Sequence, residues 1–233
     1  MFERLGKWRW ITLAVVVLVA VAFAAPLLYN HFVASPAPAQ LALPTVASPS
    51  PSSSAQPATT VSALDGAWHV GSATVVGYRV TAHALGFGQT FVGRTGKVWG
   101  SIKVVNGAVS RGSFTVDMTS FSGSKRERTV ADTKKYPTAT FVLTQPFKAK
   151  GSATGTVQHY AARGNLILRR RTIPVTLTVS QERKGGALYV LATCPVVFSH
   201  WHIAVPFGVK SHGSVEILLG LVRGAGNTSS AAS

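Results

Sequence analysis

The sequence predicts an all-β protein of about eight antiparallel strands with one short helix, folded as a barrel or a sandwich. Three observations predict it. Apolar and polar residues alternate with a period of two in several stretches, most strictly from Val175 to Ser180. Glycine-containing turn signals separate these stretches, and a helical composition occurs only at about Lys125–Lys134, before Tyr136-Pro137. Closure into a barrel removes exposed strand edges, and an eight-stranded barrel is large enough to hold one small ligand.

Residues 1–32 predict a cytoplasmic stub and a transmembrane anchor. Ile11–Leu28 is a run of about 18 uncharged residues, which at 1.5 Å per residue nearly spans a hydrocarbon core of about 30 Å. Three Lys or Arg residues precede the run and the next Lys or Arg is Arg79, so the positive-inside rule places the N-terminus in the cytoplasm. A cleaved signal peptide is the alternative, because Ala22–Ala24 has the small-x-small form of a cleavage site. Both alternatives export the remainder, to the periplasm or the cell exterior.

Residues 33–61 predict a disordered linker. Six prolines lie here among Ser, Ala and Thr, with no charge, so this stretch cannot form a hydrophobic core. A flexible tether of this length spans roughly 30 Å. Residues 225–233 are small and polar and predict a disordered tail. Residues 62–224 remain as a single domain.

Within that domain the expected strands follow from alternation and from turns. Asn106-Gly107 lies between two apolar stretches and is a strong signal for a two-residue hairpin, and Gly185-Gly186 marks a second turn. Inward positions are predicted on three further strands, which carry Phe114, Val116 and Met118, then Phe141 and Leu143, and last Val215, Ile217 and Leu219.

The composition excludes several classes of enzyme. Lys and Arg total 23 against 7 Asp and Glu, a net charge of +16, and so few carboxylates count against paired-acid hydrolases and calcium sites. The single cysteine, Cys194, excludes an internal disulfide and a Cys-rich zinc site. It precedes Pro195 in an apolar strand, where a thiol is usually buried and inert. No serine lies in a Gly-x-Ser-x-Gly elbow. We therefore expect neither catalysis nor a cofactor.

A series of short motifs runs in order through the domain: Trp68–Val70, Gly77–Val80, Val92–Thr95, Val98–Ile102, Phe114–Ser120, Tyr136–Phe141, Gly164–Leu168, Thr172–Val175, Phe198–Ile203, His212-Gly213 and Glu216–Leu219. With this order and spacing, the segment from Trp68 to Leu221 resembles the YceI-like family of lipocalin-like, polyisoprenoid-binding proteins. Tyr136–Phe141, with the sequence YPTATF, is the most specific of the matching motifs.

The resemblance implies a lipocalin-like barrel around an apolar tunnel for a long isoprenoid chain, such as a quinone or polyprenyl tail, without catalysis. Tail affinity is hydrophobic and increases with length. The chain departs from the family pattern at Thr129 after Arg128, at Arg169-Arg170, and at His200 and His202. These changes fall at strand ends and in loops, so they bear on the head group of the ligand rather than on the fold.

The candidate tunnel-lining residues are apolar or aromatic residues of the expected strands and the segment around Trp201. They are Tyr78, Val80, Phe114, Val116, Phe141, Leu143, Leu166, Leu168, Phe198 and Trp201. The alternative is that these residues form an ordinary filled core, because alternation does not distinguish a hollow barrel interior from a packed one.

Basic clusters form a second candidate site. Arg169-Arg170-Arg171 is the densest, and a solvated surface is its ordinary interpretation. The functional hypothesis is contact with a phosphate head group or an anionic lipid surface at the barrel mouth, through Arg94, Arg128, Arg169 and Arg170. A pI near 10.9 also permits nucleic-acid binding, but export makes that partner unsuitable.

A metal-dependent enzyme with a three-histidine site is the weakest alternative. His200 and His202 are two residues apart, so on a strand they would share a face, with His212 as a third ligand. No carboxylate lies near to orient the imidazoles, and we expect no metal. The sequence thus predicts an exported, single-pass membrane protein that binds a long-chain lipid, with a structural module that presents a basic face as the other alternative. It does not indicate the oligomeric state.

Overall fold

The computed structural model describes residues 37–44, 64–84, 87–123, 129–149, 156–184 and 186–224. The expected membrane anchor at residues 1–32 and the expected tail at residues 225–233 lie outside this part of the chain. Within it, no helix has both the length and the apolar character needed to cross a membrane.

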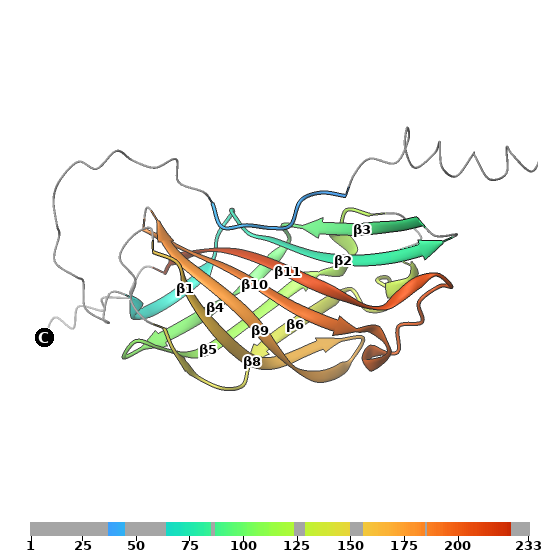
Figure 1. Ribbon diagram of the computed structural model, residues 1–233. Helices are drawn as coiled ribbons and strands as arrows, with labels where there is room; N and C mark the ends of the chain where they lie inside the picture. Colours follow the sequence, from blue (N-terminus) through green and yellow to red (C-terminus); the bar gives the residue numbers. More distant parts are fainter. Residues whose placement is uncertain are drawn as a thin grey trace, which may run out of the picture. The chain divides into compact units, whose positions relative to one another are not determined.

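Eight antiparallel strands close into a ring, which confirms the predicted eight-stranded barrel (Figure 1). The ring closes because β1 pairs with β11 on one side and with β4 on the other. In spatial order the ring consists of β1 (Gly66–Val70), β4 (Val98–Val105), β5 (Ala108–Asp117), β6 (Thr138–Leu143), β8 (Gln158–Leu168), β9 (Arg171–Lys184), β10 (Ala187–Val197) and β11 (Val209–Arg223).

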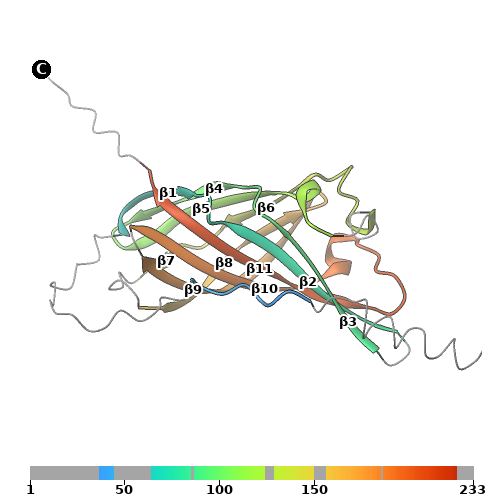
Figure 2. The ribbon, with the colours of Figure 1, turned by 90° about the horizontal axis from the view of Figure 1, so that it is seen from above.

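Three further strands extend this ring. β11 is long enough to pair with β1 at Leu221–Arg223 and with β2 (Val75–Ala84) over Val209–Leu218. β3 (Phe87–Thr95) pairs with β2, so the two strands form a flap that prolongs one end of the wall (Figures 1 and 2). β7 (Phe147–Lys148) adds a short pairing to β5.

The local turn chemistry agrees with the sequence at the β4–β5 hairpin. Asn106 and Gly107 have φ values of 50° and 69°, the left-handed conformation that a two-residue hairpin requires. Of the expected helix at Lys125–Lys134, residues 129–131 are helical and turns follow, so the helix ends three residues earlier than expected. Its first part lies outside the described residues.

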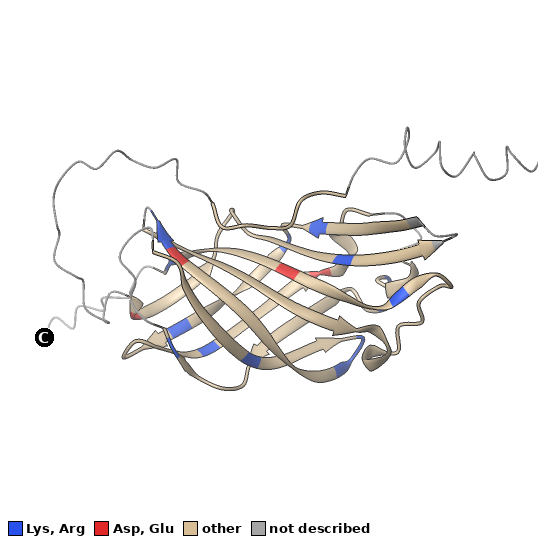
Figure 3. Cartoon of the chain, viewed as in Figure 1, with Lys and Arg blue, Asp and Glu red and all other residues tan. Residues whose placement is uncertain are grey.

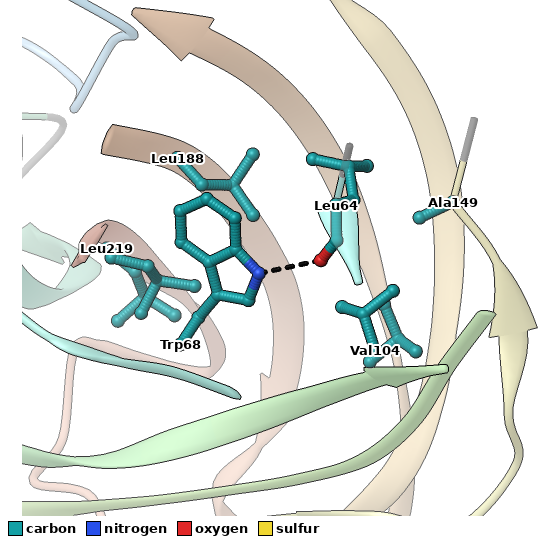
Figure 4. Packing of buried hydrophobic residues seen from close by; sticks show 8 residues of the cluster. Leu64, Trp68, Val104, Ala149, Leu188 and Leu219 are labelled. Atoms are coloured by element: carbon teal, nitrogen blue, oxygen red, sulfur yellow. Dashed lines mark hydrogen bonds between the residues drawn. The ribbon is translucent and has the colours of Figure 1, made fainter. Parts of the chain in front are cut away.

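One end of the barrel is packed solid. Trp68 is 1% exposed, and its indole Nε1 donates a 2.8 Å hydrogen bond to the Leu64 carbonyl (Figure 4). Leu188 and Leu221 are equally buried in the same cluster, and Arg223 stacks over the Trp68 ring at 5.1 Å. The indole thus buries a large apolar area without leaving its N–H unpaired, and it closes the barrel at the β1 end.

Candidate ligand cavity

The barrel interior holds a cavity of about 610 Å³. Its wall is formed mainly by inward-facing residues of β2 to β11, and nearly all of these side chains are aliphatic or aromatic. Because successive side chains of a strand alternate between the two faces, the same alternation that predicted the strands provides this lining. The wall includes no Lys, Arg, His, Asp or Glu among the described residues. The barrel is therefore hollow and apolar.

All ten candidate tunnel residues lie on the cavity wall. They are Tyr78, Val80, Phe114, Val116, Phe141, Leu143, Leu166, Leu168, Phe198 and Trp201. Their contact with a ligand stays a prediction. Sequence reasoning missed other wall residues, including Phe91, Ala162, Val179 and Gln181. The same period-two pattern in β8 and β9 could have found Ala162 and Val179, whereas a glutamine does not stand out as an interior residue.

Glycines in the wall allow aromatic rings to lie flat against it. The Tyr78 ring lies over Gly93, where an added Cβ would come within 2.4 Å of ring carbon Cε1. Phe141 lies over Gly164 in the same way, with a Cβ-to-Cζ distance of 2.3 Å. A side chain at either glycine would push its ring away from the wall. These small residues therefore help to keep the interior empty.

The cavity mouth lies at the end opposite Trp68. It is bordered by the β8–β9 hairpin, by the 3-10 helix η3 (Phe198–Trp201) and by residues 203–209 before β11. Phe207 lines the cavity and is also fully exposed, so its ring stands at the rim. The mouth thus presents an apolar side chain directly to the surroundings.

The rim beside the β8–β9 hairpin is basic. Arg169 donates a hydrogen bond to the His202 carbonyl and lies 5.2 Å from the centre of the Tyr136 ring. Lys135 lies over the same ring at 5.4 Å, and Arg171 donates to Nε2 of His202. A carbonyl, an imidazole and a phenol ring do not neutralise these cations. The rim therefore keeps a positive potential, in a chain that has 23 Lys and Arg residues and 7 Asp and Glu residues (Figure 3).

The hairpin that carries this charge has a strained backbone. Arg169 and Arg170 have φ values of 50° and 60°, and they link β8 to β9 as a two-residue turn. This turn type favours Asn-Gly, because a left-handed conformation costs a residue with a Cβ about 1–2 kcal/mol. The sequence therefore presents two guanidinium groups at the mouth at a cost in stability.

The other two predicted head-group residues do not join this cluster. Arg128 lies outside the described residues. Arg94 does not line the cavity and projects from the outer face of β3, where its guanidinium donates to the Ala39 carbonyl. The alternation of side chains along β3 explains this. Gln89 and Phe91 line the cavity, and Arg94, three residues after Phe91, lies on the opposite face of the strand.

The Ala39 contact belongs to a segment, residues 39–44, that lies within the predicted linker. The Leu41 N–H donates a 3.2 Å hydrogen bond to Oε2 of Glu216, whose Oε1 accepts from Arg79 Nε at 2.8 Å. Glu216 is buried on the outer side of β11. This part of the Pro-rich stretch therefore contacts the barrel instead of extending freely; for the rest of the linker, disorder stays a prediction.

Polar side chains are rare in the cavity wall, and Gln181 differs from the others. It is 4% exposed and follows Leu177 and Val179 on the inner face of β9. Its amide Nε2 is buried and has no hydrogen-bond partner within the described structure. By contrast, Gln89 also lines the cavity but is exposed at the flap.

The three candidate metal-ligating histidines do not form a site. Among the described residues, no three His, Cys, Asp or Glu side chains come together as metal ligands would. His200 lies in η3, and His202 directly follows this helix with a left-handed backbone conformation. The two residues are therefore not on one face of a strand, as the sequence had suggested. The Cys194 thiol is buried, and desolvation raises its pKa, so its reactive thiolate form is disfavoured at neutral pH.

A family model for the YceI-like domain matches residues 68–221. The chain belongs to the YceI-like family. Two solved structures resemble this YceI-like protein, a polyisoprenoid-binding domain from Saccharophagus degradans implicated in plant cell wall breakdown and BcnA from Burkholderia cenocepacia. The first has a TM-score of 0.53 at 11% identity, covering 67% of this chain and 98% of that one. The second has a TM-score of 0.51 at 22% identity, covering 65% and 98%.

At these identities the two structures support the fold of the YceI-like protein and not a shared ligand. No curated protein matches the chain significantly. The family, the barrel topology and the hollow interior are thus established independently of any assumption about the ligand.

Proposed function

We propose that this YceI-like protein binds and shelters a long-chain isoprenoid, of quinone or polyprenyl type, without catalysing a reaction. The observation that carries the proposal is the apolar cavity of about 610 Å³, closed at the Trp68 end and accessible at the other. An uncharged wall of this kind favours a hydrocarbon chain through burial alone. The Saccharophagus degradans domain, which has the same fold, is described as polyisoprenoid-binding, and this makes isoprenoids the first ligand class to test.

The cavity volume limits the ligand. At about 30 Å³ for each heavy atom with its hydrogens, taken from the volume of a water molecule, 610 Å³ accommodates about 20 heavy atoms. About 0.3 kcal/mol per heavy atom then gives about 6 kcal/mol. That free energy corresponds to a dissociation constant of tens of micromolar. A longer prenyl chain would extend beyond the mouth.

The same proposal includes a membrane location. Residues 1–32 are the proposed single-pass anchor, with the N-terminus in the cytoplasm and the barrel outside. The Arg169-Arg170-Arg171 hairpin and the exposed ring of Phe207 lie at the same mouth. Cationic side chains attract lipid phosphates, and an exposed aromatic ring suits the interface of a bilayer. We therefore propose that this rim contacts phosphate groups, either of a membrane surface or of a ligand head.

Native mass spectrometry of the full-length protein, followed by organic extraction, tests the proposal. The protein is kept in an amphipathic polymer, since detergent tails would compete for the cavity. A prenyl lipid that copurifies, or that binds after addition with a dissociation constant in the micromolar range, is the expected result. A protein that is isolated empty and takes up neither added quinones nor polyprenols would overturn the proposal.

A further inference from the structure

Gln181 lies near the closed end of the cavity. β9 leaves the mouth at Arg171 and reaches Gln181 ten residues later, about 33 Å along the strand at about 3.3 Å per residue. Leu188, a member of the Trp68 cluster that also lines the cavity, lies on the adjacent strand β10 two residues before Val190, the direct partner of Gln181. The amide is therefore far from the basic rim.

A buried amide without a partner is unfavourable. In an apolar surrounding an N–H group loses its hydrogen bonds to water and gains none. Val179 on β9 and Val190, the direct partner of Gln181 on β10, offer no side-chain acceptor. Gln158 is the direct partner of Gln181 on β8, but the Gln181 Nε2 makes no hydrogen bond to it or to any other group of the described structure. The amide thus provides a donor that a ligand in the cavity can satisfy.

Chemistry restricts the group that satisfies it. A pure hydrocarbon fills the volume but leaves the N–H unpaired. A phosphate would accept the hydrogen bond, but the wall holds no cation to compensate a buried charge. An uncharged oxygen, such as a ketone, quinone carbonyl or hydroxyl, accepts the bond without bringing a charge into the apolar interior.

We propose that Gln181 Nε2 donates a hydrogen bond to an uncharged oxygen of the ligand, which enters the barrel with its oxygen-bearing end first. This inference rests on the proposed function and narrows it to neutral oxygenated isoprenoids. With the oxygen at the closed end, the cationic rim remains for the phosphates of a membrane surface, and a prenyl phosphate is not the ligand.

A competition experiment tests this orientation. The full-length protein in amphipathic polymer is offered an 18-carbon prenyl methyl ketone and a prenyl hydrocarbon of the same carbon number, and the bound ratio is read by extraction and mass spectrometry. Dividing the ratio of a variant by that of the wild type cancels the partitioning of the probes into the polymer. Gln181→Met keeps the side-chain length and removes the donor. Gln145→Met is the matched control, because Gln145 is an exposed glutamine that does not line the cavity.

We expect the ketone-to-hydrocarbon ratio of Gln181→Met to fall about fivefold to tenfold below that of the wild type, the value of one hydrogen bond, and the ratio of Gln145→Met to equal that of the wild type. A Gln181→Met ratio equal to that of the wild type, or an equal fall in Gln145→Met, would overturn the inference and leave the proposed function intact. If neither probe binds the wild type, the proposed function itself fails.

A second measurement does not depend on the folding of a variant. The carbonyl of the bound ketone is labelled with carbon-13, and its infrared band is recorded in the wild-type protein. A band shifted to lower frequency than that of the ketone in alkane indicates the hydrogen bond. A band at the alkane frequency would show a free carbonyl and contradict the inference.

Discussion

The cavity volume makes the dependence of affinity on ligand length a quantitative test. For neutral prenyl alcohols of increasing length, each additional five-carbon unit adds about 1.5 kcal/mol while it remains inside the barrel, which is slightly more than tenfold in the dissociation constant. The capacity of about 20 heavy atoms derived from 610 Å³ predicts that the gain stops near 20 carbons. Chains of 30 and 40 carbons should then bind no more than a few times better.

Substitution at Ala162 moves this limit. Ala162 is buried and lines the cavity, and a phenylalanine there adds six heavy atoms, or about 180 Å³, to the interior. The affinity of Ala162→Phe should therefore level off near 14 carbons. Ala161→Phe is the control, since Ala161 is exposed on the outer face of the same strand.

Displacement of a fluorescent fatty probe from the full-length protein measures both series. A continued tenfold gain beyond 20 carbons in the wild type would refute the volume argument. So would an identical plateau in Ala162→Phe and Ala161→Phe, provided that the two variants unfold at similar temperatures.

Three further substitutions test the structure. Replacing Arg169-Arg170 by Asn-Gly should stabilise the protein by about 1 kcal/mol in urea unfolding, because the turn loses its strain. The same change should weaken binding to anionic vesicles by about 2 kcal/mol, or roughly thirtyfold, since each cation near such a surface contributes about 1 kcal/mol. Unchanged vesicle binding would contradict the proposed contact between this hairpin and the membrane. Trp68→Ala should destabilise the barrel by about 3–5 kcal/mol, given its burial and its bond to Leu64, and a loss below 1 kcal/mol would contradict the packed end. Hydrogen bonds from the Thr119 hydroxyl and N–H lower the pKa of Asp117 below its ordinary value of 3.8. The ionised carboxylate therefore stabilises the folded protein above pH 3.8, and this contribution is lost as the pH falls through the lower pKa of the folded state. Asp117→Asn should accordingly unfold at lower urea concentration than the wild type at pH 6, with the difference shrinking below pH 3.8.

Local patterns predicted the strands and the inner face, because both depend on neighbouring residues. Val175 to Ser180 lies within β9, and Asn106-Gly107 forms the β4–β5 turn. The barrel closure is different in kind. It depends on the pairing of Trp68 with Arg223, residues 155 positions apart, and no local pattern encodes such a register.

The candidate site was predictable where the alternation of side chains along a strand decides which face a residue occupies. The ten tunnel residues lie on the cavity wall, and Arg94 is not at the mouth because it lies on the outer face of β3. The turn at Arg169-Arg170 gave no turn signal, because arginines rarely adopt a left-handed conformation. Gln181 could not be found from the sequence, since only the structure shows that its amide lacks a partner.

The packed end beside Trp68 also has a consequence for how the proposed ligand enters and leaves the barrel. Within the described residues, a barrel packed at the Trp68 end does not let a ligand pass through along its axis. Under the proposed function, the membrane or protein that donates the ligand and the one that accepts it would both contact the cavity mouth, one after the other. If the proposed function holds, release of the ligand is the reverse of its entry, so the protein stores a lipid and does not conduct it through the barrel.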